Sequence, residues 1–475
     1  MFRKKMIHST HNFYVLYCFI LSIFIASVTL GMQTAAAATY YVSPAGASAW
    51  SQCTDIALPC SPGTAMTNAS AGDIVYFRGG TYEVGESPPY HAYYEPSNSG
   101  QPGNPIYFGA YPGEIPLFNV TVTTKGGDFA IGIVNQNYIT LDGFHVQANN
   151  GVNMGGITAN GNGIAGRIVG AIVKNSILNG GTTVITLDDN ASPFRIEQTD
   201  GALIQNNKIF NCRAAANVGR DNVSGIKFYH NSNAIVENNE IYNTTTAFSS
   251  KSDTDDSIFR YNYIHDNERG MFFATYAPNN SSDRNKVYDN ILVNNSDIAF
   301  FQYSDTDGSF HADDWQVYNN TIYGTGASAG ITYGLGTNWK FWNNIIQTSK
   351  NDRFVSLRNA QLSESDHNQF GSSPLLVRTR VYAGGNNYTS LSAWQNSGEL
   401  MGGGNPGVGS LASDSKFVNA SGNMNQLDDF KLAGDSPSKG AGRSGGDIGA
   451  NISIVGYKGN GIVRAVPRPP TLSVQ

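Results

Sequence analysis

The sequence of 475 residues has few charged residues, few cysteines and no surplus of positive charge. Asp, Glu, Lys and Arg make up 14% of the chain, and the formal net charge is -6 with a pI near 5.7. Nucleic-acid-binding domains carry basic patches and a high pI, so we expect no nucleic-acid partner. The same charge gives no general attraction to an acidic polymer, so binding of such a polymer must depend on local cations.

Long apolar runs are also scarce, and the longest lies at the N-terminus. The basic segment Arg3–Lys5 precedes an apolar run over residues 13–30, and Ala36–Ala38 fits a signal-peptidase site. An uncleaved membrane anchor is the alternative, but the run is near the lower limit for crossing a bilayer. We therefore expect a signal peptide over residues 1–38 and a secreted chain with no membrane contact after cleavage, at the cell surface, outside the cell or in a periplasm.

The four cysteines leave little room for a metal site. Cys18 belongs to the predicted signal peptide, and Cys53 and Cys60 flank a loop of six residues. An exported protein could close that loop as a disulfide, with Cα atoms less than about 7 Å apart. Cys212 has no partner in the sequence, and the spacing matches no zinc site.

Helical periodicity is missing as well, and the composition favours strands and turns. The chain contains 53 Gly, 25 Tyr and 24 Phe, and Gly and Asn interrupt every segment. Aromatic residues are enriched in strands, and Gly and Asn in turns. We therefore expect an all-β protein.

An Asn-x-Ile or Asn-x-Leu motif recurs through the middle of the chain. The motif starts at Asn175, Asn207, Asn239, Asn262, Asn290, Asn320 and Asn344. An apolar residue stands three positions before each Asn: Ile172, Ile204, Val236, Phe259, Val287, Val317 and Phe341. Such self-similarity predicts a solenoid whose stacked coils share one core. The Asn side chains are expected to form a ladder at a tight turn, in left-handed geometry.

The repeats divide the chain into segments. We predict an N-terminal cap and first coils over residues 39–130, a core over 131–365, and C-terminal coils with a cap over 366–456. A cap is expected because an open solenoid end would leave strand edges unpaired. Residues 457–475 read as a flexible tail.

Two segments near the start of the predicted mature chain resemble a known superfamily. Residues 40–46 (YYVSPAG) and 72–82 (GDIVYFRGGTY) are similar to the entry of secreted parallel β-helix proteins of the pectate-lyase-like superfamily. The resemblance implies a right-handed parallel β-helix, which we expect to contain about eight coils over residues 131–357. It also implies an acidic polysaccharide as partner, commonly cleaved by β-elimination.

Four segments that begin at Gly225, Ala247, Gly270 and Ala299 align as neighbouring strands. Strand side chains alternate between the two faces, so every second residue of these segments points outward. We expect one exposed face to carry Lys227, Tyr229, Lys251, Phe272, Phe301 and Tyr303, with Arg269 close to Lys251.

The resemblance suggests a role for each of these side chains. β-Elimination needs a base and a cation that neutralises the uronate carboxylate. A lysine acts as the base only when burial or another cation lowers its pKa. We assign Lys251 as the base, Arg269 or Lys227 as the cation and Tyr229 as a donor to the leaving oxygen. The rings of Phe272, Phe301 and Tyr303 would bind a sugar.

Acidic residues at the edges of the same face could bind Ca²⁺. The candidate ligands are Asp188, Asp189, Asp253 and Asp255. Asx-turns are the alternative explanation of Asp in such loops. No other cofactor is expected.

The tripeptide Ser250–Ser252 is similar to the Ser-Lys-Ser of alginate-lyase and chondroitinase-B-like lyases, in which that lysine is the base. The acidic pair that binds calcium in those enzymes would fall near Thr244 and Thr246, and their catalytic arginine near Ala274. These departures remove support for calcium and for the arginine.

Three functions follow, and we favour the first. A polysaccharide lyase would use the lysines. A glycoside hydrolase would need two carboxylates, supplied by Asp188 with Asp253 or Asp255. A non-catalytic adhesion protein would hold glycans on the aromatic face. In each case the partner is a polysaccharide or glycan, and we expect a monomer.

Overall fold

The structure is a computed structural model that describes most of the chain beyond the predicted signal peptide. The described residues are 37–88, 91–121, 129–148, 156–158, 167–181, 184–186, 190, 192–275, 281–304, 312–324, 331–333, 336–347, 355–358, 360–371, 377–380, 386–420, 424 and 426–459. Only the backbone is described for 156–158, 275, 301–304, 331–333, 355–358, 360–361 and 377–380. Two compact units are present, Met1–Ala38 and Thr39–Gln475, and every element below belongs to the second. In this described part, none of the helices has the length and apolar character that a membrane crossing needs.

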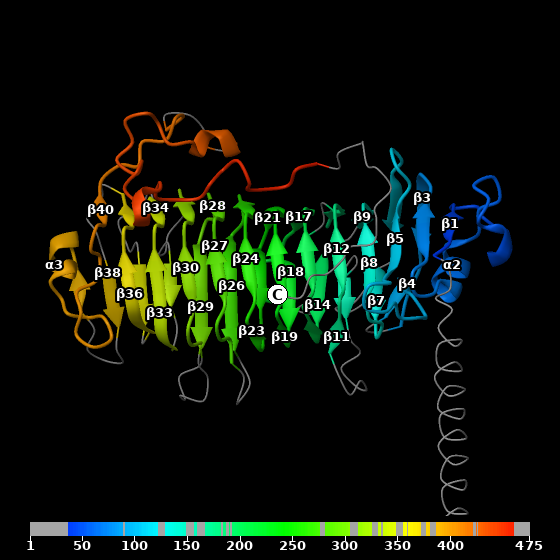
Figure 1. Ribbon diagram of the computed structural model, residues 1–475, viewed down its shortest axis with the longest axis horizontal. Coiled ribbons are helices and arrows are strands. Elements are labelled where there is room, and N and C mark those ends of the chain that lie inside the picture. Colours follow the sequence, from blue (N-terminus) through cyan, green and yellow to red (C-terminus); the bar gives the residue numbers. More distant parts are fainter. Residues whose placement is uncertain are drawn as a thin grey trace, which may run out of the picture. The chain divides into compact units, whose positions relative to one another are not determined.

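Three long sheets, each of 12 strands in the described residues, make up the second unit (Figure 1). Sheet 1 contains β1 (Thr39–Val42), β2 (Ile74–Phe77), β5 (Ile106–Ala110), β8 (Ile139–Asp142), β12 (Ile172–Lys174), β16 (Leu203–Gln205), β20 (Ile235–Glu237), β24 (Ile258–Arg260), β27 (Lys286–Tyr288), β30 (Gln316–Tyr318), β33 (Gly336–Trp342) and β36 (Ala360–Asp366). Sheet 2 contains β3 (Gly80–Val84), β6 (Pro116–Val120), β9 (His145–Ala148), β13 (Ile177–Asn179), β17 (Lys208–Cys212), β21 (Glu240–Thr244), β25 (Tyr263–His265), β28 (Ile291–Val293), β31 (Thr321–Tyr323), β34 (Ile345–Gln347), β37 (Gln369–Phe370) and β40 (Leu411–Ala412).

Sheet 3 carries the four segments that the sequence aligns. It contains β4 (Ala92–Tyr94), β7 (Phe129–Val134), β10 (Gly156–Thr158), β14 (Phe194–Glu197), β18 (Ser224–Tyr229), β22 (Thr246–Ser250), β26 (Arg269–Thr275), β29 (Ile298–Ser304), β32 (Ile331–Tyr333), β35 (Val355–Arg358), β38 (Val377–Arg380) and the antiparallel β39 (Asn387–Tyr388). A short sheet contains β11 (Ile168–Val169), β15 (Thr199–Asp200), β19 (Asn231–Ser232) and β23 (Thr254–Asp255). The described helices are η1 (Trp50–Gln52), α2 (Pro62–Asn68), α3 (Leu391–Gln395), η2 (Leu427–Phe430) and η3 (Arg443–Gly445).

Each coil runs through sheet 1, a tight turn, sheet 2, a loop and sheet 3. The strands of successive coils pair in parallel, and Val236, Phe259, Val287 and Val317 lie side by side in one buried column. Strands β8 to β33 of sheet 1 mark eight coils in the described residues. The prediction of an all-β parallel β-helix is confirmed, and so is the interior column.

An asparagine ladder follows the turn between sheets 1 and 2. Its rungs are Asn207, Asn239, Asn262, Asn290, Asn320, Asn344 and Asn368, and all are buried. The Nδ2 of Asn262 donates to Oδ1 of Asn290 at 2.9 Å, and the backbone N–H of Asn262 donates to the same oxygen at 3.0 Å. Because each amide pairs with the next coil, the ladder satisfies polar groups that lie between two buried strands. Serine hydroxyls stand at its two ends, Ser176 and Ser410.

Two details of the predicted ladder are wrong. Leu178 pairs with Ile209, so Ser176 stands beside Asn207, and the residue predicted as the first rung, Asn175, stands beside Asn206. In that coil the apolar residue of the interior column is also displaced by one position, because Val173 and not Ile172 pairs with Ile204. The left-handed residue is also the one before each rung. Its φ is 51–59° at Asn206, Asn238, Tyr261, Asp289, Asn319 and Asn343.

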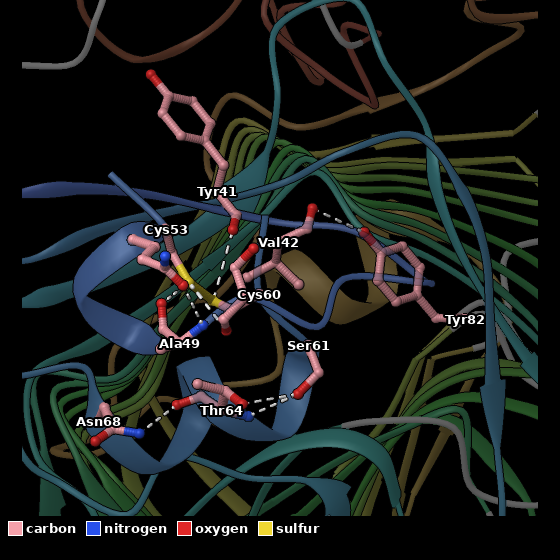
Figure 2. The surroundings of a disulfide bond; sticks show 11 residues. Tyr41, Val42, Ala49, Cys53, Cys60, Ser61, Thr64, Asn68 and Tyr82 are labelled. Atoms are coloured by element: carbon pink, nitrogen blue, oxygen red, sulfur yellow. Dashed lines mark hydrogen bonds between the residues drawn. A yellow bond between two sulfur atoms is a disulfide. The ribbon is translucent and has the colours of Figure 1, made fainter. Parts of the chain in front are cut away.

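The N-terminal cap contains the predicted disulfide (Figure 2). Cys53 and Cys60 are bonded, their Cα atoms lie 5.5 Å apart, and both are fully buried. The backbone N–H of Tyr41 in β1 donates to the Cys53 carbonyl at 2.8 Å, and the N–H of Cys60 donates to the Tyr41 carbonyl at 3.0 Å. The loop therefore lies against the first strand of sheet 1, and Ser61 caps the helix that follows by accepting from the N–H of Thr64 at 3.1 Å.

Replacing both cysteines of this loop by alanine is expected to lower the free energy of unfolding by about 2 kcal/mol. The bond closes a loop with a sequence separation of 7, and a loop this short restricts the unfolded chain only moderately. Urea unfolding of the parent and of the Cys53→Ala/Cys60→Ala variant measures the difference. A reductant should destabilise the parent and leave the variant unchanged. Titration of both thiols in the unreduced protein would contradict the prediction.

The C-terminal segment (red in Figure 1) runs back past the strands of earlier coils instead of adding a further coil. The N–H of Gly449 donates to the Asn343 carbonyl at 2.8 Å, and that of Gly456 to the Tyr261 carbonyl at 2.7 Å. The N–H of Lys458, at the start of the predicted flexible tail, donates to Oδ1 of Asn206 at 2.7 Å. Residues 442–459 thus hydrogen-bond to turns of several successive coils. Residues 460–475 lie outside the described part.

Candidate functional site

The register of β18, β22, β26 and β29 agrees with the alignment made from the sequence. Ile226, Phe248, Met271 and Phe300 form one inward row. Lys227, Ser249 and Phe272 form the adjacent outward row, and the backbone of Phe301 pairs with that of Phe272. Lys251 follows β22, one coil beyond Lys227 and two residues further along the strand. The side chains of Phe301 and Tyr303 lie outside the described part.

The predicted exposure of this face is wrong. Lys227 is 0% exposed and Phe272 is 5% exposed. The loop 213–223, between β17 and β18, lies over the face, and we call it the covering loop. Its Arg220 carbonyl accepts from the Thr246 hydroxyl at 2.7 Å. Its apolar residues pack into a small cluster with Cys212 and Ile185.

Lys227 is a buried amine whose pKa lies well below the ordinary value. Its Nζ donates to the backbone carbonyl of Asp221 in the covering loop at 2.9 Å. Burial is the main cause of the lowered pKa, and the positive charges of Lys251 and Arg195 add to it. Burial also raises the pKa of the neighbouring Cys212 thiol to about 12, against the opposing charge of Lys227. Burial therefore favours the neutral form of both the Lys227 amine and the Cys212 thiol.

Lys251 has the surroundings of a charged ammonium. Its Nζ lies 2.9 Å from Oδ1 of Asn190 and 3.4 Å from a carboxylate oxygen of Asp221, and it also donates to Oδ1 of Asn222. These three atoms are acceptors, and the side chain is 12% exposed. Asp221 thus contacts both lysines, Lys227 through its carbonyl and Lys251 through its carboxylate.

Arg195 is a cation of this site that the sequence did not indicate. It lies directly opposite Lys227 in β14, and its guanidinium is 2.9 Å from the Glu197 carboxylate and 4.8 Å from the ring centroid of Tyr229. The strand that pairs with β18 on this side is β14. Arg195 could have been found from the sequence by extending the alignment back by one coil, to residues 194–197 (FRIE), in which Arg195 points outward.

The structure does not place Arg269 beside Lys251. Arg269 stands opposite Thr246, and Lys251 lies five residues beyond Thr246 along the strand. The Arg269 guanidinium contacts Asp297 at 3.2 Å and lies 5.4 Å from the ring centroid of Phe272. Because Arg269 covers this ring, Phe272 offers no open face to a sugar in this conformation, and its role stays a prediction.

A second arginine at that end of the strands anchors the covering loop. Arg220 lies 2.6 Å from the Glu268 carboxylate and 2.7 Å from the Asp297 carboxylate. Its side chain is 49% exposed. These ion pairs join the loop to the residues immediately before β26 and β29.

The described acidic residues of the predicted calcium site serve the turns between coils. Asp253 accepts from the N–H of Ser281 at 3.1 Å, and Asp255 accepts from the N–H of Asp283 at 2.7 Å. Burial raises the pKa of Asp255. Among the described residues, no group of three or more His, Cys, Asp or Glu could hold a metal ion. Asp188 and Asp189 lie outside them, so calcium stays a prediction.

Comparisons with known proteins agree with the fold. The family described as "Pel9A-like, right handed beta helix region" matches residues 40–234. No curated protein matches the sequence. Pectate lyase Pel9A is 15% identical, with 88% of this chain and 97% of that chain covered and a TM-score of 0.40. XylC in complex with xylose is 10% identical, with 73% of this chain and 88% of that chain covered and a TM-score of 0.42. The Dettilon tailspike protein gp208 is 11% identical, with 71% of this chain and 62% of that chain covered and a TM-score of 0.43.

Proposed function

We propose that this pectate-lyase-like right-handed parallel β-helix is an exported polysaccharide lyase that cleaves a uronate-containing polymer by β-elimination. The observation that supports the proposal is the lysine pair of sheet 3. Lys227 is a buried amine with a strongly lowered pKa, and Lys251 in the next coil contacts the acceptor oxygens of Asn190, Asn222 and Asp221. The reaction needs a neutral base and a cation at the carboxylate, and the pair offers one of each.

The proposal exchanges the roles that the sequence suggests for the two lysines. Nζ of Lys227 takes the proton from the carbon beside the carboxylate, and that C–H electron pair becomes the new C=C bond. The bond from the next carbon to the glycosidic oxygen breaks, and the Tyr229 hydroxyl gives its proton to the leaving oxygen. Lys251 binds the carboxylate, whose negative charge grows as the proton leaves. Arg195 stays against Tyr229 and adds positive charge nearby.

The covering loop must move before a polymer reaches Lys227. In the described conformation the Asp221 carboxylate lies at Lys251, where the proposal places the substrate carboxylate. A uronate entering the face would replace Asp221 at this ammonium, and displacing the loop would expose Lys227 at the same time. Substrate binding and uncovering of the base are therefore coupled in the proposal.

Arg220→Ala is expected to raise the open population of the covering loop about fivefold. The variant loses two half-exposed ion pairs, and together such pairs are worth about 1 kcal/mol. The rate at which a thiol reagent modifies Cys212, read by peptide mapping, measures opening without reference to activity. The rate of polymer cleavage at low substrate concentration should rise in parallel.

Arg213→Ala is the matched control for the loop. Arg213 begins the same loop, is exposed, and its guanidinium donates one hydrogen bond to Asn243 at 2.8 Å. Its removal should leave the modification rate of Cys212 within about twofold of the parent. Equal rates for the parent and both variants would show that Arg220 does not hold the loop.

The proposed function is tested by incubating the protein with uronate polymers and recording two products. Unsaturated ends that absorb in the ultraviolet identify a lyase. New reducing ends without that absorbance identify a hydrolase. Retention on a polymer without either product identifies a binding protein, and the last two results would each remove the lyase proposal.

A non-catalytic glycan-binding protein is the second candidate. The full burial of Lys227 under a loop anchored by two ion pairs favours it. A hydrolase has less support, because Asp253 and Asp255 are engaged in hydrogen bonds to the next coil.

A further inference from the structure

A polar groove lies on the outward face of sheet 1, on a different sheet from the two lysines. Its volume is 420 Å³. Three residues at the starts of neighbouring strands line it, together with three from the turns that precede these strands: Ile258, Lys286, Gln316, Asp256, Arg284 and Asp314. Strands of one sheet lie about 4.8 Å apart, so the groove crosses three coils over about 10 Å.

Some charged groups of the groove form ion pairs within the described part of the chain, and others do not. Arg284 forms two hydrogen bonds to the Asp256 carboxylate, at 2.7 and 2.8 Å, so these two charges offset each other. Asp314 accepts a hydrogen bond from the Asn338 amide. Within the described part of the chain, neither the Lys286 ammonium nor the Gln316 amide has a side-chain hydrogen bond or ion pair. In the described part of the chain the groove therefore presents one ammonium, Lys286, and one carboxylate, Asp314, that have no ion pair, beside the Gln316 amide.

Stacked rings join two of the groove's coils, those of β27 and β30, to the next coil, that of β33. Tyr288, Tyr318 and Trp342 lie two residues further along the strands, with ring centroids 4.7 and 4.4 Å apart. Arg260 lies 5.9 Å from the centroid of Tyr288, and Arg443 lies 4.5 Å from that of Trp342. The ring faces are thus occupied, and the stack acts as a stiff border that keeps the groove residues in register.

We infer that this groove is a second, non-catalytic carbohydrate site, which binds two neighbouring sugars of an acidic polysaccharide. Lys286 pairs with a carboxylate of the sugar, and Gln316 and Asp314 hydrogen-bond its hydroxyl groups. The inference takes the class of polymer from the proposed function. It adds a point of attachment away from the lysine pair, so that one long polymer can be held at two places and bind more tightly than at either alone.

The test compares two lysine variants with the same change in charge. Lys286→Gln removes the uncompensated ammonium. Lys340→Gln removes an ammonium of the same outward row that is outside the groove and 2.5 Å from the Glu364 carboxylate. Both changes are made in the Lys227→Met protein, so that the polymer stays intact. Affinity electrophoresis in gels that contain polygalacturonate, polymannuronate or neutral glucan measures binding.

Lys286→Gln is expected to weaken binding to at least one acidic polymer about tenfold, which corresponds to the loss of one charge-assisted hydrogen bond. Lys340→Gln should stay within twofold, and the neutral glucan should not distinguish the proteins. Equal effects of the two variants, or no retention by any acidic polymer, would overturn the inference. Thermal midpoints within a few degrees of each other show that both variants are folded.

The outcomes separate this inference from the proposed function. Retention that depends on Lys286, in a protein whose unmodified form yields no unsaturated product, keeps the groove and removes the lyase. Unsaturated product from the unmodified protein, with retention unchanged by Lys286→Gln, keeps the lyase and removes the groove.

Discussion

Lys227→Met is expected to lower kcat for elimination by at least about 10³-fold while the protein stays folded. Proton transfer by a positioned base contributes about 10²–10⁴-fold to an enzymatic rate, and the proposal has no second neutral amine at the site. Methionine has nearly the length of lysine and is fully apolar, so it suits a side chain that is 0% exposed. Initial rates of formation of the unsaturated product measure the effect.

Lys251→Met is the matched comparison for this experiment. It removes the ammonium that the proposal places on the substrate carboxylate, so KM should rise by about tenfold or more in addition to any fall in kcat. A parent-like kcat for Lys227→Met together with a complete loss for Lys251→Met would contradict the assignment. That result would restore the roles that the Ser-Lys-Ser resemblance suggests.

Lys227→Met has a second readout, protein stability as a function of pH, that does not depend on activity. The unfolded chain binds a proton at Lys227 up to a pH of about 10.4. The folded protein releases that proton at a much lower pH, because burial lowers the pKa of Lys227. Between these two values the unfolded state binds more protons, so the parent gains stability as the pH rises.

Lys227→Met lacks this dependence. The variant should be more stable than the parent near neutral pH, and the difference should shrink as the pH approaches about 10.4. Above a pH of about 8.5 the Cys212 thiol lowers stability in both proteins, since its folded pKa is raised to about 12, and the difference between the proteins cancels this effect. Parallel stability curves from pH 6 to 10 would mean that Lys227 is charged in the fold.

The register of the site could be predicted because, in a set of parallel strands, the alignment of the strands is the only choice to be made. Once Gly225, Ala247, Gly270 and Ala299 are aligned, alternation decides which residues point outward, and the pairing agrees. The burial of Lys227 could not be predicted in this way. It depends on where the covering loop lies, and the loop is positioned by contacts to Ile185 and Asp297, far away in the sequence.

The position of the ladder shows a similar limit. Each rung follows a left-handed residue, and in four coils that residue is also Asn, which produces the pairs at 206–207, 238–239, 319–320 and 343–344. At 175–176 the pair reads Asn-Ser, and a motif that requires Asn selects the left-handed residue instead of the rung. The better sequence signal for a rung was therefore a pair of polar residues, Asn-Asn or Asn-Ser, whose second residue is the rung.

The second large effect is expected at a central rung of the ladder. Asn290→Ala should lower the free energy of unfolding by at least about 4 kcal/mol. In the parent, Nδ2 of Asn290 donates to the Phe259 carbonyl at 2.9 Å and to Oδ1 of Asn320 at 3.0 Å. Its Oδ1 accepts from the N–H and the Nδ2 of Asn262. Each buried polar group that loses its partner costs about 1–3 kcal/mol, and several lose theirs together.

Asn290→Ser separates the hydrogen bonds from the packing, because the chain already uses serine at the ends of the ladder. The Ser176 hydroxyl accepts from the N–H of Phe144 at 3.2 Å and donates to the Lys174 carbonyl at 3.1 Å. A serine at 290 can make the equivalent bonds but cannot reach the next rung, so its cost should be about half that of alanine. Urea unfolding, with hydrogen exchange at the flanking coils because solenoids can open locally, measures both variants. Equal costs for alanine and serine would mean that the ladder stabilises the fold through packing and not through its hydrogen bonds.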